Sequence, residues 1–589
     1  MAVSRSVRVV LVLILGAVFV SAAGVAFTWL TLGQAPALAP DSALVLRVDD
    51  SLVEIEPNRL LGPYLFQSPP TLRSVTAALR RAKTDSRVSA LVIAPGGTPG
   101  MWAMTQELRD AILDFKTSKK PVTAFLEYGG DQEYYLASAA DRVVMVPTST
   151  LDLTGLASYE VFLRGTLDKA GAVADFVHVG DYKAAPNAFT ERGFTPAHRE
   201  MAESLNRDMF DQLVEGIATA RRKTPDEVRA LVDEGPFLPE DALRAGLIDG
   251  LAYEDQVFGP ADARKSGATG RPRVEMSAYA ARGGAGFRLG RRHPIALIYA
   301  VGTIASGRSG RSAQGDVVGS QTLVEAIRKA REDATVRAVV LRVDSPGGSS
   351  VASDVIWHEL MLTRVKKPLV VSMSDLAASG GYYIAMPAHV IVAQPGTLTG
   401  SIGIFGGKLV TGGTLEKLGA NIEAVSQGRF AEMNSPDRVW TPEERAKLQA
   451  QLEAFYDQWV EKAAEARRST PEKIDAVAQG RVWTGRQAKA AGLVDELGGL
   501  DRALAIARQR AKLPPGDDSD ITVYPSRRGF FEMMSDPLGG SGGLESLRLG
   551  AAWGLLSPEE RRAAATVLAP LRLFRPGEPL ALMPFVFRR

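Results

Sequence analysis

The chain contains two copies of one sequence pattern, displaced by a nearly constant interval. The stretch "TLDKAGAVADFVHVGDYK" at 166–183 aligns with "TLEKLGANIEAVSQGRFA" at 414–431, and "DSRVSALVI" from Asp85 aligns with "DATVRAVVL" from Asp333. Both pairs give an offset of 248 residues (414 − 166 and 333 − 85). Two further matches keep the same order: "KKPVTAF" from Lys119 with "KKPLVVS" from Lys366, and residues 237–251 with 483–497. Such ordered self-similarity predicts a tandem duplication.

The duplication divides the 589 residues into five parts. Residues 1–41 precede the repeats, 42–260 form the first copy, and 293–510 form the second. The Gly/Arg-rich stretch 261–292 is interpreted as a linker. The tail 511–589 has no counterpart in the first copy, and the sequence gives it no role. In each copy, short Val/Ile/Leu runs alternate with helical patterns, which predicts an α/β fold of βαβ units with a mainly parallel sheet. Sites are then expected at the carboxyl ends of the strands.

The N-terminal segment predicts a membrane anchor. After Arg5 and Arg8, no charged residue occurs until Asp41. The apolar run covers about 25 residues, or about 37 Å as a helix, which is enough to cross a bilayer. The two arginines predict a cytoplasmic N-terminus, with both copies on the other side of the membrane. A cleaved signal peptide is the alternative, because "SAA" at 21–23 resembles a processing site.

Composition excludes several classes of site. The chain has no cysteine, so thiol nucleophiles, thiolate metal sites and disulfides are excluded. Its five histidines form no metal-binding pattern, and no metal or cofactor is expected. A net charge of +2 gives no support for nucleic-acid binding.

Two glycine-containing turns follow strands in the second copy. The first, "DSPGG" at 344–348, places Gly347 and Gly348 where backbone N–H groups can face a ligand, as an oxyanion hole requires. A plain strand-to-helix turn is the alternative interpretation. The second, "DLAASGGYYIA", places Ser379 at the start of a helix. It is a candidate nucleophile, and a helix N-cap is the alternative.

The two copies have complementary losses. At the offset of 248, Asp131 of the first copy stands opposite Ser379, and Ala431 of the second copy stands opposite Lys183. A neutral lysine can activate a serine, so a site shared by the copies accounts for both losses. A solvated surface amine is the alternative for Lys183. For Lys183 to act as a base near neutral pH, the pKa of its amine must fall by about 2–3 from the usual value of about 10.4.

The motifs "RVDSPGG", "DLAASGGYYIA", "TLTGSIGI" and "VGDYKAA" resemble the long, duplicated form of bacterial signal peptide peptidase A. This resemblance implies a ClpP/crotonase-like serine protease, in which Ser379 is the nucleophile and Lys183 the general base. It implies backbone oxyanion donors at Gly347 or Gly348, together with Gly380. Asp344 is a departure, because the family commonly has Asn at that position.

The resemblance also implies a cellular setting. The expected enzyme is a single-pass protein of the bacterial inner membrane with periplasmic catalytic domains, assembled as a homotetramer. Its expected substrates are remnant signal peptides. Two alternatives remain from the residues: an acyl-CoA enzyme on a crotonase-like fold, and an inactive membrane-tethered scaffold.

Overall fold

The structure is a computed structural model. It describes residues 38–56, 69–98, 100–258, 272–283, 294–312, 315–514, 520–524 and 577–583, together with Gly16 and Gly24. The predicted anchor at 9–32 lies outside these ranges except for those two glycines. Among the described residues, no helix has both the length and the apolar character needed to span a bilayer.

The first copy is built on a six-stranded parallel sheet in the order β8-β5-β3-β2-β1-β9. Its strands are β1 (Ser42–Val48), β2 (Val88–Pro95), β3 (Val122–Leu126), β5 (Arg142–Met145), β8 (Gly250–Leu251) and β9 (Arg273–Glu275). The main helices are α3 (Leu72–Thr84), α4 (Trp102–Lys116) and α5 (Asp131–Ala137). Thr71 and Ser74 form a capping box that starts α3, which buries Leu72 and Leu79.

The second copy repeats this arrangement. Five strands of its sheet are neighbours in the order β10-β14-β16-β17-β21. The corresponding order in the first copy is β1-β2-β3-β5-β8. They span β10 (Ile295–Val301), β14 (Ala338–Ser345), β16 (Leu369–Ala378), β17 (Val390–Ala393) and β21 (Glu496–Leu497). The sheet also includes β18 (Leu398–Gly400), β20 (Val482–Thr484) and β22 (Ile521–Tyr524), and β20 is antiparallel to β18. The principal helices are α13 (Ser320–Glu332), α14 (Ser350–Lys366), α15 (Gly380–Ala385), α17 (Pro442–Arg467) and α20 (Leu500–Arg510). The predicted α/β duplication with mainly parallel sheets is confirmed.

A third sheet joins the copies, in the order β12-β13-β11-β15-β23-β19-β7. Its strands are β7 (Val173–Val179), β11 (Thr303–Ala305), β12 (Gly310–Ser312), β13 (Gly315–Gly319), β15 (Gly347–Ser349), β19 (Ile404–Val410) and β23 (Leu580–Leu582). The first-copy strand β7 pairs antiparallel with the second-copy strand β19 over seven residues, from Val179 opposite Ile404 to Val173 opposite Val410.

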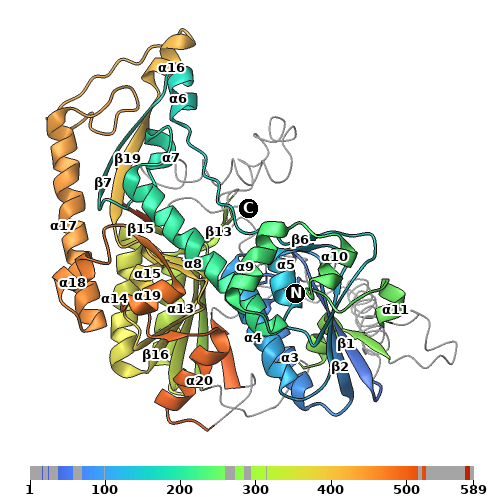
Figure 1. The fold of residues 1–589 in the computed structure, drawn as a ribbon. Coiled ribbons are helices and arrows are strands. Elements are labelled where there is room, and N and C mark those ends of the chain that lie inside the picture. The colour runs from blue at the N-terminus through green and yellow to red at the C-terminus, as the bar shows by residue number, and fades with distance from the viewer. Residues whose placement is uncertain are drawn as a thin grey trace.

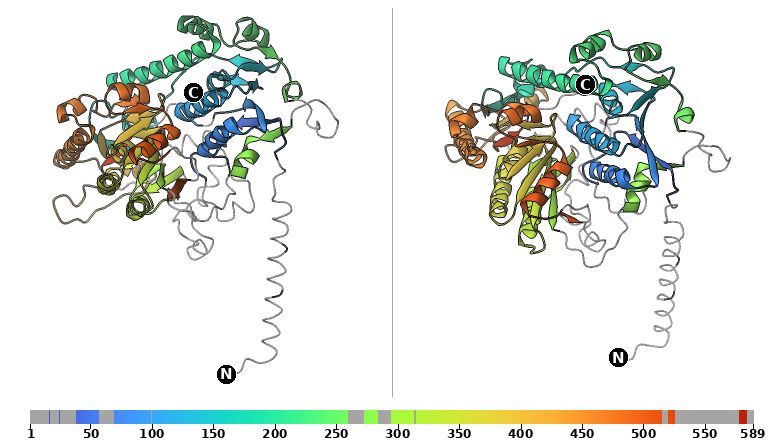
Figure 2. Two further views of the ribbon diagram at one scale, coloured as in Figure 1. Left: turned by 90° about the horizontal axis from the view of Figure 1, so that it is seen from below. Right: turned by 60° about the horizontal axis from the view of Figure 1, so that its bottom comes forward.

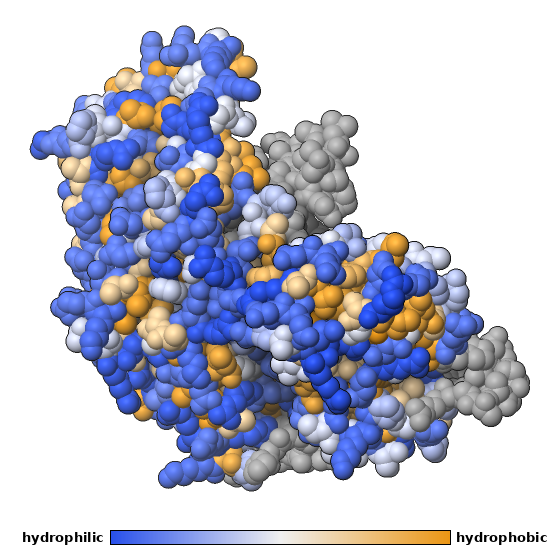
Figure 3. Space-filling model, viewed as in Figure 1, coloured by the Kyte–Doolittle hydropathy of each residue, from blue (hydrophilic) through white to orange (hydrophobic). Residues whose placement is uncertain are grey.

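Helix α8 (Pro196–Arg221) also connects the copies, because it contacts β20 of the second copy and α5 and α9 (Pro225–Glu234) of the first. Figures 1 and 2 show the main sheets of the two copies in neighbouring lobes, with α8 running between them. In Figure 3 the exposed face is mainly hydrophilic, with apolar residues in small separate patches, so the apolar runs of the sequence are largely internal.

Parts of the predicted linker and tail have regular structure. Within 261–292, residues 273–283 form β9 and α12 (Met276–Gly283), and β9 extends the first sheet beside β1. In the tail, β22 pairs with β10, and β23 lies between β15 and β19. The tail therefore contributes one strand to the main sheet of the second copy and one to the sheet that joins the copies.

Candidate active site

Ser379 lies at the junction where the central strand β16 ends and α15 begins. It is fully buried, and its backbone N–H donates to the Gly400 carbonyl oxygen at 2.8 Å. It occupies the N-cap position of α15, but its side chain makes no capping hydrogen bond. Its φ of 55° lies in the left-handed region, which is costly for a residue with a side chain. The helix-cap interpretation therefore does not account for this serine.

Lys183 follows β7 of the first copy and points into the second copy. Its Nζ donates to Ser379 Oγ at 2.8 Å, to the Ser401 carbonyl oxygen at 3.1 Å and to Ser401 Oγ at 3.0 Å. The side chain is 1% exposed, so the solvated-amine interpretation is wrong. Desolvation lowers the pKa of Lys183 well below its usual range, because the ammonium loses its hydration when buried. A lowered pKa favours the neutral form of the amine, and only the neutral form can accept a proton.

Ser401 is a site residue that sequence reasoning did not identify. It follows β18, is fully buried and has a φ of 51°. Ser379 and Ser401 thus both adopt left-handed backbone conformations and both contact one lysine amine. The motif "TLTGSIGI" contains Ser401, but the motif alone did not indicate which of its residues touches the lysine.

The glycine turn of the second copy lies directly beside the serine turn. Gly347 has a φ of 101°, and a Cβ built on it would lie 2.7 Å from the backbone nitrogen of Gly380. Gly348 has a φ of 152°, and a Cβ there would lie 2.0 Å from the Ile304 carbonyl oxygen. Only glycine permits these approaches. The structure therefore brings Gly347 and Gly380 together and places Gly348 against β11.

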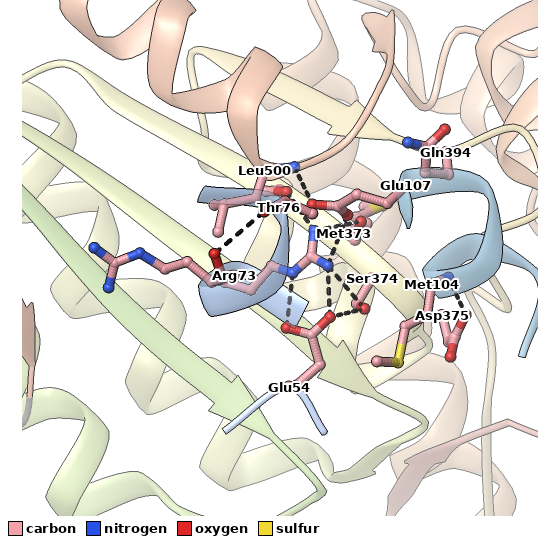
Figure 4. Close-up of polar contacts among 12 residues, drawn as sticks. Glu54, Arg73, Thr76, Met104, Glu107, Met373, Ser374, Asp375, Gln394 and Leu500 are labelled. Carbon is pink, nitrogen blue, oxygen red and sulfur yellow. Dashed lines mark hydrogen bonds and ion pairs between the residues drawn. The ribbon is translucent and has the colours of Figure 1, made fainter. Parts of the chain in front are cut away.

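A buried charge cluster joins the two copies at strands β14 and β16 (Figure 4). Arg342 on β14 is fully buried and contacts Glu54 at 2.5 Å and Glu107 of α4 at 2.9 Å. Ser374 on β16 donates to the same Glu54. Desolvation lowers the pKa of Arg342, but the two carboxylates outweigh it and raise the pKa above its ordinary value. Desolvation raises the pKa of Glu107 to about 7, against the opposing effect of Arg342.

Two aspartates, Asp344 on β14 and Asp375 on β16, interact electrostatically with this cluster. Asp375 accepts hydrogen bonds from the backbone N–H groups of Met101 at 2.8 Å and Met104 at 2.9 Å, at the start of α4. Asp344 accepts one from the Leu376 N–H at 3.0 Å. Desolvation raises the pKa of Asp375 to about 6. Desolvation, with the negative charges of Asp375 and Glu54, raises the pKa of Asp344 well above its usual range.

The described residues contain no group of three or more acidic or histidine side chains that could hold a metal ion. The chemistry that the geometry offers is that of a buried hydroxyl beside a buried amine whose pKa favours the neutral form. Asp131 lies at the start of α5, the position in the first copy that corresponds to Ser379, and one of its carboxylate oxygens accepts from the Gly155 N–H at 3.0 Å.

Comparison with known proteins identifies the family. The model of peptidase family S49 matches residues 114–266 and again 362–514, two ranges displaced by the same 248 residues as the sequence repeat (362 − 114). The serine protease SPPA of Arabidopsis thaliana chloroplasts is 34% identical over 455 residues, covering 76% of this chain and 67% of its own. Protease 4 of Salmonella typhi is 34% identical over 493 residues, covering 80% of this chain and 76% of its own.

The similarity to solved structures is weaker. ClpP1 from Listeria monocytogenes aligns over 35% of this chain and 94% of its own, at 16% identity and a TM-score of 0.22. Such a score is too low to establish a ClpP-type fold, whereas the double family match and the identities with the two proteases are sufficient for the family. The chain belongs to peptidase family S49, contains the family domain twice, and is a serine protease.

Proposed function

We propose that this protein is a membrane-anchored endopeptidase that uses Ser379 as nucleophile and Lys183 as general base. The observation that carries the proposal is the contact of 2.8 Å between Lys183 Nζ and Ser379 Oγ, in a pocket where burial disfavours the ammonium form. Each residue is supplied by the copy that retains it, which accounts for the complementary losses in the repeat.

The proposed reaction begins with the neutral Lys183. Its amine accepts the hydroxyl proton while Ser379 Oγ forms a bond to the scissile carbonyl carbon, and the carbonyl electron pair moves onto oxygen. Backbone N–H groups at Gly347 or Gly348, together with Gly380, stabilise that oxyanion. The Lys183 ammonium then protonates the leaving amine as the C–N bond breaks. Water then attacks the acyl-enzyme in the same way, with Lys183 again accepting the proton. This step releases the carboxylate product and regenerates Ser379.

The proposed substrates are remnant signal peptides in or at the bacterial inner membrane. The apolar sequence before Asp41 supports a single anchor, with the catalytic domains on the periplasmic side. A homotetramer is part of the same proposal and rests on the family resemblance. An acyl-CoA enzyme does not fit a chain of this family, and an inactive scaffold does not account for the retention of both Ser379 and Lys183.

Ser379→Ala and Lys183→Ala test the dyad in a cleavage assay with an internally quenched apolar peptide. Lys183→Ala is expected to lower activity by about 10²–10⁴-fold, the usual contribution of an acid–base group, and Ser379→Ala by up to about 10⁶-fold, as when a serine nucleophile is removed. Lys367→Ala is the matched control, since Lys367 Nζ caps the Ala330 and Asp333 carbonyls at the opposite end of the sheet. Full activity in either dyad variant, or equal loss in the control, contradicts the proposal.

A further inference from the structure

The segment 577–583 lies as a strand beside the dyad. Strand β23 pairs antiparallel with β15, with Gly348 opposite Ala581, and Leu580 lies opposite Phe405 of β19. In the described sheet, β15 and β19 are neighbours of β23 and not of each other. Because strands in a sheet lie about 4.8 Å apart, removal of β23 leaves a gap one strand wide between two unpaired edges. Such a gap is suited to binding an extended peptide by strand addition.

The backbone of this segment reaches the glycines that flank the nucleophile. A Cβ built on Gly347 would lie 2.1 Å from the Ala581 carbonyl oxygen, and one built on Gly380 would lie 3.1 Å from the same atom. The N–H of Met583 donates to the Pro346 carbonyl oxygen at 2.9 Å. A carbonyl of the tail thus lies at the turns where the proposed oxyanion donors meet.

The side chains of the segment pack on the immediate neighbours of both dyad residues. Met583 lies in one buried apolar cluster with Ala184, which follows Lys183, and Ala378, which precedes Ser379. Leu580 and Leu582 lie in another cluster with Ala185 and Phe405. All four residues from Leu580 to Met583 are buried. The groove therefore accepts apolar side chains, which is the chemistry expected of a signal-peptide remnant.

Polar contacts hold the start of the segment. Ser349 Oγ donates to Glu578 at 2.6 Å, and Ser350 Oγ donates to the Pro579 carbonyl oxygen at 2.9 Å. The Gly577 N–H donates to the Gly407 carbonyl oxygen of β19 at 3.1 Å. The segment is thus bound along its whole described length, from β19 across to the glycine turn.

We infer that residues 577–583 occupy the peptide-binding groove of this same chain as an intramolecular competitor, and that an extended apolar peptide must displace them before cleavage. This inference rests on the proposed function, since it names what binds at the Ser379–Lys183 site. A tethered strand competes at an effective concentration in the millimolar range, so the groove is open for only a fraction of the time. The apparent affinity for substrate is reduced by that fraction.

A reversible cross-link tests the inference in the full chain. The protein has no cysteine, so the register pair Leu580→Cys and Phe405→Cys introduces the only two thiols. Oxidation locks β23 against β19, and the expected result is a fall in kcat/KM of about tenfold or more, which dithiothreitol reverses. Arg311→Cys with Asp316→Cys is the matched control, since this pair joins β12 and β13 in the same sheet, away from the groove. Its oxidation is expected to leave kcat/KM unchanged.

Full activity in the oxidised Leu580–Phe405 pair, with the disulfide verified by mass spectrometry, overturns the inference. A second measurement separates this outcome from failure of the proposed function. A fluorescent apolar peptide is titrated against the same cysteine pair in the Ser379→Ala background, and binding is followed by anisotropy. Binding to the reduced form and loss of binding on oxidation support the inference even without cleavage. Equal binding of the peptide to the reduced and oxidised forms overturns the inference. If the reduced cysteine pair with Ser379 intact binds the peptide but does not cleave it, only the proposed chemistry is contradicted.

Discussion

The guanidinium of Arg342 and the carboxylate of Glu107 meet 2.9 Å apart across the boundary between the two copies. Arg342 belongs to the second copy and Glu107 to the first, and both side chains are buried. Glu54, also from the first copy, completes the pairing. The two halves of the protein are thus joined by buried charge as well as by the shared sheet.

Arg342→Met is expected to destabilise the fold strongly. It leaves Glu54 and Glu107 buried without their positive partner, and breaking such a group typically costs about 3–5 kcal/mol. Urea denaturation measures this loss as a lower free energy of unfolding. Arg502→Met is the control, because its ion pair with Glu496 is exposed and is worth about 0–1 kcal/mol. Equal effects of the two substitutions would contradict the role assigned to the buried cluster.

Lys183→Met is expected to change the pH dependence of stability as well as abolish cleavage. Desolvation lowers the pKa of Lys183, so the unfolded chain binds a proton that the folded chain does not. Wild-type stability should therefore rise with pH above the lowered pKa, until the unfolded lysine also loses its proton near its usual pKa of about 10.4. Methionine does not titrate, so the free energy of unfolding of the variant should rise less with pH than that of the wild type. Unfolding free energies at about pH 6 and about pH 9 test this, and parallel pH profiles for both proteins would refute it.

Ser401→Ala is expected to weaken catalysis through Lys183, which makes Ser401 a positioning residue. Ser401 Oγ accepts from Nζ at 3.0 Å and stabilises the ammonium more than the neutral amine. Its loss should lower kcat by about tenfold with little change in KM, and move the acid limb of the pH–rate profile to lower pH. A purely structural role for Ser401 would leave that limb in place.

Asp344→Asn is expected to stabilise the protein at alkaline pH. Desolvation and neighbouring negative charge raise the pKa of Asp344, so the folded state retains a proton that the unfolded state has released. The stabilisation that this proton provides is present at low pH and is lost as the pH rises through the raised pKa. Asparagine retains an oxygen that can accept from Leu376 N–H, but it does not titrate. The midpoint of thermal unfolding should exceed the wild-type value by a few degrees at about pH 8 and by less at about pH 5, because the wild type begins to lose stability once the pH passes the unfolded pKa of about 3.9. A variant that melts below wild type at the higher pH would contradict this account.

The sequence was sufficient to predict the duplication and to select Ser379 and Lys183 as candidates for one shared site, because the repeat supplied an internal comparison at each position. It did not reveal Ser401, since hydrogen bonds to Lys183 depend on how the loop after β18 folds. It also did not reveal the pairing of β7 with β19 or the strand at 580–582. Those pairings join residues far apart in the chain, and a three-residue strand carries too few positions to show a pattern.

The role of Arg342 could not be predicted from the sequence for a different reason. It stands within the apolar run "AVVLRVD" of a buried strand, where a charged residue is unusual. Its partners Glu54 and Glu107 come from the other copy, so no spacing within either repeat indicates them. Only the packing of one copy on the other identifies the cluster.

The proposed dyad is divided between two diverged copies, and this division sets the number of active sites per chain. Each chain of 63.0 kDa contains two family domains but one Ser379 and one Lys183, and these meet within a single chain. Titration of the nucleophile should therefore count one reactive serine per two domains. A gene that encodes either half alone would supply a nucleophile without a base or a base without a nucleophile.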